Sequence, residues 1–348
     1  MDKIRNFTAA FPSISESVKK IGLQEFPYFR TLEFDELTLQ IKFKLLKIAN
    51  ANEHNLAILN STGTGAMDAA VSNLIPENAK IMVIIGGRFG ELWKQISSCY
   101  TNNIFNYNIV PGQNIDLNYL EQELQSTKPY ALLMQHNETS MMHLFDIEKI
   151  GNICHKYNIK LFVDACSSFA IDFMDVSKYK IDVLVFSSQK GLLIPAGLSF
   201  VIFKKNLELI SRNYYFNLSY YNKNEGRFIQ PFTPPVILMN QLNYQLDNIL
   251  NQSINKWIEQ ISKKANYFRE KAKKIQLNIS SENLTNCGTL IYNRGDNFEL
   301  CELLKKLNIY VVNSKGWWGD YISVGHIGEV SYEDMDVLLF QLEKWYLK

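Results

Sequence analysis

The sequence predicts an α/β protein of two units: a large one built on a mainly parallel β-sheet, and a smaller α+β unit after it. Two observations lead to this prediction. Through the middle of the 348-residue chain, short apolar runs alternate with amphipathic stretches, which is the rhythm of βαβ units. After about residue 235 the pattern changes to a long helical stretch followed by short strands and helices. We therefore expect one domain over residues 1–240 and another over residues 241–348.

The apolar runs of the first domain each have the length of one strand. Their nearly continuous apolarity, without polar alternation, is typical of strands that are covered on both faces. The expected strands are residues 57–59, 81–85, 131–134, 161–163, 183–186 and 200–203. Amphipathic stretches such as residues 147–157 predict the helices between them. Parallel sheets of this kind bind ligands at the carboxyl ends of their strands.

The second domain is expected to begin with one long connecting helix over residues 236–275, rich in Lys, Glu, Gln and Asn with apolar spacing. A strand (289–292), a helix (298–307), a strand (309–312) and a C-terminal helix (332–346) should follow.

Composition narrows the possible functions. The chain has 36 basic and 35 acidic residues, a net charge of +1, so nothing suggests binding to nucleic acid or to an anionic membrane. Five scattered cysteines include no CxxC pair, which favours reduced thiols, a cytoplasmic location and no metal site. The first residues lack the apolar stretch of a signal peptide, and no apolar run is long enough to span a bilayer.

A turn rich in small residues, Thr62-Gly63-Thr64, follows the first predicted strand and opens a helix. Backbone N–H groups in such a turn can approach an anion, and the helix N-terminus favours negative charge. The pattern fits a phosphate cradle, although a turn of this composition is more often just a capped loop. It does not match the P-loop pattern, because Thr64 is followed by Gly65-Ala66 and the lysine that this pattern requires after its glycine is missing.

Two ionisable residues end later strands. Asp164 follows the strand at 161–163, which is where α/β enzymes place functional carboxylates, although on this pattern alone a helix N-cap explains it slightly better. Lys190 follows the strand at 183–186 through small polar residues, and a desolvated lysine there would be a nucleophilic amine. A phosphate cradle, a carboxylate and a lysine together match the needs of pyridoxal 5′-phosphate (PLP): an imine-forming amine, a partner for the pyridine nitrogen and an anion site.

With these residues in place, the stretch from about residue 60 to 201 resembles the class V aminotransferases of PLP fold type I. That family includes alanine–glyoxylate, serine–pyruvate and 2-aminoethylphosphonate–pyruvate aminotransferases. The blocks that carry the resemblance are Thr62-Gly63-Thr64-Gly65-Ala66, Gly87-Arg88-Phe89-Gly90-Glu91, His136-Asn137-Glu138-Thr139-Ser140, Val163-Asp164-Ala165-Cys166-Ser167-Ser168-Phe169 and Ser187-Ser188-Gln189-Lys190. Weaker likeness continues through Phe232-Thr233-Pro234-Pro235 and Gly325-His326-Ile327-Gly328.

The resemblance implies a role for each matched residue. Lys190 would be the Schiff-base lysine, Asp164 the partner of the pyridine nitrogen and Phe89 the ring that stacks on the cofactor. Thr139 would reach the phenolic oxygen of PLP. The cofactor phosphate would be held by Thr62, Gly63, Thr64 and Gln189, and by Thr233 of the neighbouring subunit, since the family forms homodimers with shared active sites. His136 and Glu138 are expected to be structural.

The expected reaction is therefore ping-pong transamination between a small amino donor and a carbonyl acceptor, a 2-oxo acid or similar. Two departures from the family pattern matter. The N-terminal PGP block is reduced to Phe11-Pro12-Ser13, and the arginine that binds the substrate carboxylate is replaced by Ser323. A serine cannot form a bidentate, charge-assisted clamp.

Ser323 leaves two possibilities. Either another cation takes over, with Arg30, Arg88, Arg227 and Lys315 as candidates, or the substrate has no α-carboxylate at that place.

Two other readings of the whole chain stay open. One keeps PLP for lyase, decarboxylase or desulfurase chemistry, although Cys287 lies beside a predicted strand rather than in a mobile loop. The other is a PLP-fold protein recruited as a sensor or scaffold, against which the intact Lys190 and Asp164 weigh.

Overall fold

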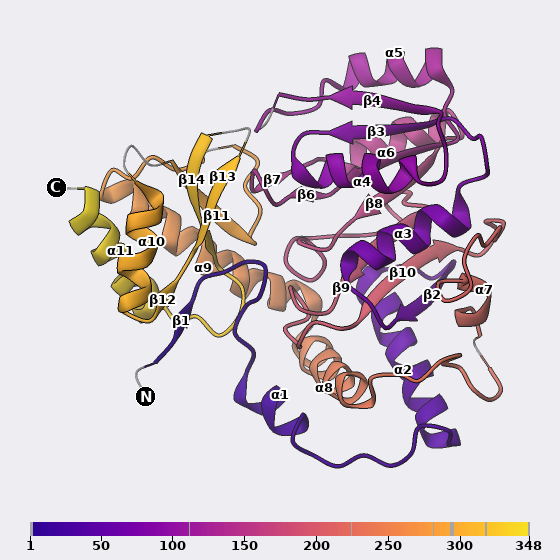
Figure 1. The fold of residues 1–348 in the computed structure, drawn as a ribbon, viewed down its shortest axis with the longest axis horizontal. Helices are drawn as coiled ribbons and strands as arrows, with labels where there is room; N and C mark the ends of the chain where they lie inside the picture. Colours follow the sequence, from indigo (N-terminus) through magenta and orange to yellow (C-terminus); the bar gives the residue numbers. More distant parts are fainter. Residues whose placement is uncertain are drawn as a thin grey trace.

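A seven-stranded sheet forms the centre of the large unit (Figure 1). The computed structural model describes residues 3–110, 112–223, 225–280, 282–292, 296–316 and 319–346, without the side chains of 314–316 and 319. The strand order is β2-β10-β9-β8-β5-β3-β4, and only β10 runs against the others. These strands are β2 (His54–Leu59), β3 (Ile81–Ile85), β4 (Ile104–Asn108), β5 (Ala131–Gln135), β8 (Lys160–Asp164), β9 (Val183–Ser187) and β10 (Ser199–Lys204).

The six predicted strands are confirmed, and the edge strand β4 is an addition. Its sequence, Ile-Phe-Asn-Tyr-Asn, alternates in polarity and leaves several side chains exposed, so it lacks the continuous apolar run of the central strands. A short hairpin, β6 (Asn137–Glu138) with β7 (His143–Leu144), lies outside the main sheet.

Helices cover both faces of the sheet, which explains why its central strands are apolar throughout. One face packs against α3 (Gly63–Leu74), α4 (Arg88–Ser98) and α7 (Leu218–Tyr221). The other packs against α2 (Leu32–Ala49), α5 (Leu117–Thr127), α6 (Ile147–Lys156) and α8 (Val236–Gln252), with α1 (Glu16–Ile21) lying on α8. No helix in the described ranges is long and apolar enough to cross a membrane.

The smaller unit is built on a three-stranded antiparallel sheet of order β11-β14-β13. Its elements are β11 (Gly288–Tyr292), β12 (Ile309–Tyr310), β13 (Val312–Gly316), β14 (Gly319–Gly325), α9 (Ile254–Lys274), α10 (Asn297–Lys306) and α11 (Tyr332–Tyr346). The N-terminal strand β1 (Arg5–Asn6) pairs with β12, and Phe7 is buried in the same core. The division at residues 240/241 stays a prediction, but the first few residues lie on the C-terminal unit.

The predicted single helix over residues 236–275 is wrong in one respect. The chain forms two helices, α8 and α9, that meet at Ser253. Ser253 has φ 72°, which no helical residue adopts, and its hydroxyl accepts a hydrogen bond from the backbone N–H of Lys256. A serine that caps the second helix therefore ends the first.

The parallel arrangement brings the predicted blocks together. Strands β2, β3, β5, β8 and β9 point the same way, so the segments that follow them meet at one edge of the sheet. In Figure 1 the arrowheads of β3 and β4 point towards the C-terminal unit.

Candidate active site

Lys190 and Asp164 lie at this edge, both buried: Lys190 is 7% exposed and Asp164 is 5% exposed. The Asp164 carboxylate accepts a hydrogen bond from the backbone N–H of Cys166 at 2.7 Å. Burial raises the pKa of Asp164, while that N–H and the charge of Lys190 act to lower it. Among the described residues, neither side chain forms an ion pair within 4.0 Å, so both stay available to a ligand.

Phe89 lies on the opposite side of this space, in the first turn of α4. The Lys190 ammonium is 5.7 Å from the centre of the Phe89 ring. The Glu138 carboxylate fixes this turn, because it accepts hydrogen bonds from the backbone N–H groups of Phe89 (3.1 Å) and Gly90 (3.3 Å). A Cβ on Gly87 would stand 2.5 Å from the Glu138 carboxyl carbon, so only glycine permits this approach. The structural role expected for Glu138 is thus to hold the end of α4.

The Thr62-Gly63-Thr64 segment forms the N-terminus of α3. Thr62 is the N-cap residue, but its side chain makes no capping bond, and the first turn contains no acidic residue. A Cβ on Gly63 would stand 2.5 Å from the Cys166 sulfur, so the helix end lies close to the Asp164 loop. A helix N-terminus whose backbone N–H groups are not capped by a side chain suits an anion better than the capped loop that composition alone favoured.

Two polar atoms near Lys190 are buried and have no hydrogen-bond partner within the described structure: Gln189 Oε1 and Ser187 Oγ. Buried polar groups are normally satisfied, so both atoms suit a ligand that supplies donors or acceptors. Thr139 donates its hydroxyl to Ser167, which the sequence did not single out, and this bond orients Thr139 at the end of the hairpin β6–β7. Sequence reasoning missed Ser187, Ser167 and Cys166 as site residues because only the fold brings them together.

Ser323 lies on β14 opposite Leu290 of β11. Alternation along β14 directs Ser323 to the same face as Tyr321, while Ile322 and Val324 enter the core of the small unit. The Tyr321 hydroxyl donates to the carbonyl of Ser140, beside Thr139. Ser323 is therefore on the side of β14 that faces the large unit, as its predicted place in the substrate region requires.

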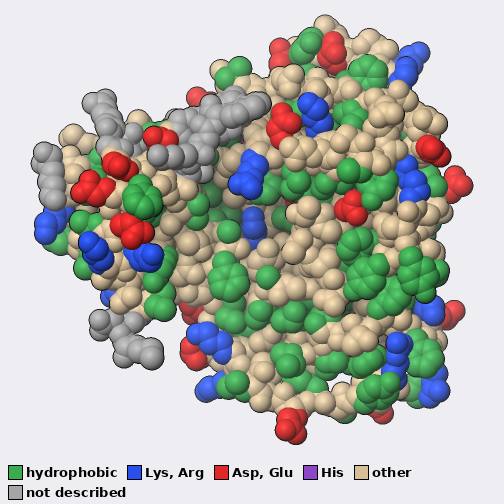
Figure 2. Space-filling view, in the orientation of Figure 1, with side chains coloured by type: hydrophobic (Ala, Val, Ile, Leu, Met, Phe, Trp, Pro, Cys, Tyr) green, Lys and Arg blue, Asp and Glu red, His purple; other side chains and the backbone are tan. Residues whose placement is uncertain are grey.

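The remaining predicted residues lie further out. Thr233 is exposed and lines a small pocket with Asn60, Phe232 and Tyr215. Arg88 and Arg227 are exposed, while Arg30 stacks on two phenylalanines and donates to the Gln230 carbonyl. The side chain of Lys315 lies outside the described residues. On the face that Figure 2 shows, the surface is hollowed between the two units, and hydrophobic side chains gather over the larger one.

These residues fit PLP on four observations. A buried carboxylate and a buried lysine lie without ionic partners, an aromatic ring flanks the lysine, an uncapped helix N-terminus approaches the same loop, and buried polar atoms lack partners. A cavity of about 570 Å³ lies elsewhere and includes none of the cofactor-site residues that the sequence predicted. The kinds of groups that lie together around Lys190, rather than cavity size, therefore identify the candidate site.

Comparison with known proteins supports the same class. Residues 30–316 match the family Aminotransferase class-V. An uncharacterized aminotransferase of Methanocaldococcus jannaschii is 31% identical over 233 residues, 65% of this chain and 60% of that protein. A 2-aminoethylphosphonate–pyruvate transaminase of Pseudomonas aeruginosa is 31% identical over 173 residues, 49% of this chain and 46% of its own length. The chain thus spans about half to two thirds of these relatives.

The fold is likewise that of known enzymes. The crystal structure of ureidoglycine–glyoxylate aminotransferase from Bacillus subtilis superimposes with a TM-score of 0.92 at 19% identity, covering 100% of this chain and 94% of that one. The fold is PLP fold type I. Because the family match covers most of the chain, this protein belongs to the class V aminotransferase family.

Proposed function

We propose that the protein is a PLP-dependent aminotransferase that moves an amino group from a small amino donor to a carbonyl acceptor in two half-reactions. The observation that carries this proposal is the position of Lys190, buried near the Asp164 carboxylate and facing the Phe89 ring 5.7 Å away. A buried amine beside an unpaired carboxylate serves no evident structural purpose, whereas PLP chemistry needs both.

When bound, PLP supplies an electron sink for the carbon that carries the amino group. Asp164 would hold the proton on the pyridine nitrogen, Phe89 would cover one face of the ring, and Thr139 would donate to the phenolic oxygen. The phosphate would lie at the N-terminus of α3, on Thr62, Gly63 and Thr64, with Gln189 beside it.

Within this arrangement, the chain's own residues position groups and move protons. With PLP bound, the Lys190 amine would be the group placed to move a proton at the donor's α-carbon. Burial raises the pKa of Asp164, while the Cys166 N–H and the Lys190 charge favour its carboxylate form. Glu138 keeps Phe89 in place through the backbone of α4, which preserves the spacing across the site.

The choice of substrate depends on Ser323. The relatives named above act, by their names, on 2-aminoethylphosphonate with pyruvate and on ureidoglycine with glyoxylate. An acceptor such as glyoxylate or pyruvate carries a carboxylate, which needs a partner when it is buried. We favour a substitute cation from a loop or a neighbouring subunit over a substrate without a carboxylate, because common amino donors are themselves amino acids.

A homodimer with shared sites is part of this proposal. Exposed aromatic side chains surround Phe232, next to Thr233: they are Tyr214, Tyr215 and Tyr220. An exposed aromatic patch of this kind is typical of an interaction surface. A second subunit there would cover the patch and bring its Thr233 to the other chain's cofactor phosphate.

The scattered, unpaired cysteines support a cytoplasmic location.

The desulfurase alternative is weakened by the position of Cys287. Its thiol is fully buried, and burial raises its pKa to about 12. A desulfurase cysteine has to be a thiolate on a mobile segment. The position of Cys287 has no bearing on lyase or decarboxylase chemistry, which the same cofactor supports.

The distinguishing experiment is to mix the purified holoenzyme with single amino donors in the absence of any acceptor. Transamination predicts stoichiometric conversion of bound PLP to the pyridoxamine form. This conversion is measured as loss of the absorbance of bound PLP at visible wavelengths, together with formation of one equivalent of oxo product. Release of ammonia, CO₂ or sulfide with the PLP absorbance unchanged would instead establish a lyase, decarboxylase or desulfurase.

A further inference from the structure

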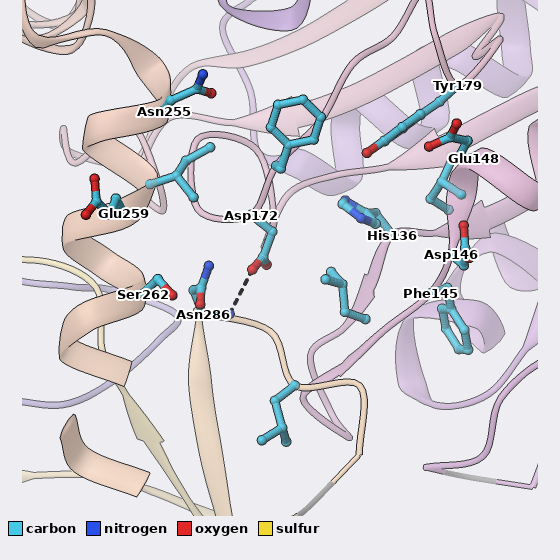
Figure 3. A pocket seen from close by; sticks show the side chains of 15 residues that line it. His136, Phe145, Asp146, Glu148, Asp172, Tyr179, Asn255, Glu259, Ser262 and Asn286 are labelled. Carbon is cyan, nitrogen blue, oxygen red and sulfur yellow. Dashed lines mark hydrogen bonds between the residues drawn. The ribbon is translucent and has the colours of Figure 1, made fainter. Parts of the chain in front are cut away.

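A cavity of about 570 Å³ lies between the two units (Figure 3), and Lys190 is not part of its lining. From the large unit it is lined by His136, the segment 144–148, Asp172, Phe173 and Tyr179, and from the C-terminal unit by α9 and the segment 284–286. Nothing in the proposed transamination uses it.

A neutral histidine lines the cavity from the large unit. His136 is 4% exposed and its ring reaches the cavity (Figure 3). Burial lowers the pKa of His136 to about 4, so the ring is neutral at pH 7 and adds no positive charge.

The charge of the lining is one-sided. Four carboxylates contribute to it, and no lysine or arginine does: Asp146, Glu148, Asp172 and Glu259. Three of them pair with lysines that are themselves more than half exposed and outside the lining, and surface pairs of this kind are weak. Asp172 is 3% exposed and accepts hydrogen bonds from Thr285 and from the backbone N–H of Asn286.

The walls of the cavity are largely aromatic and aliphatic. Phe145 is buried, Phe173 is 51% exposed at the opening, and the Tyr179 ring lies beside Phe173 with its hydroxyl directed inward (Figure 3). Aromatic faces together with carboxylates are the chemistry that recognises organic cations.

We propose that this cavity is a binding site for a small organic cation, a protonated amine on an apolar body, separate from the PLP site. The amine would lie among the carboxylates, and the apolar body would pack against Phe145, Phe173 and Tyr179. Because the walls come from both units, a bound ligand would also hold the units together. The backbone N–H of His136 donates to the Asp164 carbonyl at 2.8 Å, so the site also adjoins the strand that ends at the cofactor.

The test uses the PLP-loaded enzyme and isothermal calorimetry with N,N-dimethylbenzylamine, a tertiary amine that is protonated at pH 7 and cannot form an imine with PLP. We expect a Kd on the order of 1 mM, which is reasonable for so small a ligand. Phenylacetate, of similar size and opposite charge, should bind at least about tenfold more weakly, because the lining is acidic. Equal binding of the two compounds would overturn the proposal.

Three substitutions test whether the amine binds in this cavity. Ser262→Phe fills the cavity from α9 and should abolish binding of the amine, whereas Lys274→Phe, on an exposed position at the end of the same helix and outside the lining, should leave it unchanged. Phe173→Ala removes one wall without removing a hydrogen bond and should weaken binding at least about threefold. If Ser262→Phe does not fold, as judged by circular dichroism, Phe173→Ala decides. Amine binding that survives both changes would place the ligand elsewhere and contradict the proposal.

Discussion

The Glu138 carboxylate holds the backbone N–H of Phe89 at 3.1 Å, so a buried acid fixes the aromatic ring that faces Lys190. Five donors converge on this carboxylate: the N–H groups of Phe89, Gly90 and Ser140, the Ser140 hydroxyl and the Gln135 amide. Glu138 thus supports the site by holding the backbone of Phe89 and Gly90.

Glu138→Gln is therefore expected to destabilise the fold and to weaken PLP binding. The amide replaces one accepting oxygen with a donor that faces other donors, which should cost about 1–3 kcal/mol of unfolding free energy. Denaturant unfolding and PLP titration measure the two effects. Glu77→Gln is the matched control, since Glu77 is exposed and should change stability by no more than about 0.5 kcal/mol. Equal behaviour of the two variants would show that the carboxylate is not needed.

Asp164→Asn is expected to retain PLP but to lose at least about a hundredfold in transamination rate. A neutral amide preserves the shape of the site but cannot hold a proton on the pyridine nitrogen, so transition-state stabilisation falls. Single-turnover kinetics with the best amino donor, measured at saturating PLP, gives the comparison. Turnover close to wild type would mean that Asp164 only caps the turn through Cys166.

If Thr233 serves the neighbouring subunit, activity should be recoverable by mixing. Lys190→Ala and Thr233→Ala subunits, each with its own tag, are combined and the hybrid is isolated. In a shared-site homodimer, one site of the hybrid has both native residues, so half of the sites should regain wild-type PLP affinity and activity. An active monomer in light scattering, or a hybrid with no fully native site, would argue against sharing.

Ser323→Arg restores the residue that the family has at this place. If the pocket has only lost its clamp, kcat/KM for small amino acids should rise, because an arginine binds their carboxylate in a bidentate way. If a substitute cation already occupies the space, crowding of like charges should lower kcat/KM for these amino acids. A donor panel distinguishes these results, and unchanged kinetics across it would mean that residue 323 does not face the substrate.

The sequence predicted most of this site because its residues follow strands whose apolar runs are easy to recognise. Thr62, Phe89, Thr139, Asp164 and Lys190 all come directly after such strands, and parallel topology then brings them together. The resemblance to a family assigned their roles, which spacing alone left open.

What the sequence did not reveal depends on contacts between distant segments. The approach of Cys166 to Gly63 and the bond from Thr139 to Ser167 exist only in the folded chain. The break at Ser253 was missed because apolar spacing continues through it, while a single residue with positive φ ends the helix. Strand β14, which contains Ser323, is partly polar and gave no strand pattern of its own.

The central claim is that Lys190 is the residue that binds the cofactor. Treating the holoenzyme with borohydride and mapping its peptides tests this directly, with Lys204 and Lys160 as internal references on neighbouring strands. We expect one pyridoxyl group per chain, on Lys190, and none on the Lys190→Ala variant. A label on another lysine, or an unlabelled protein at saturating PLP, would contradict it.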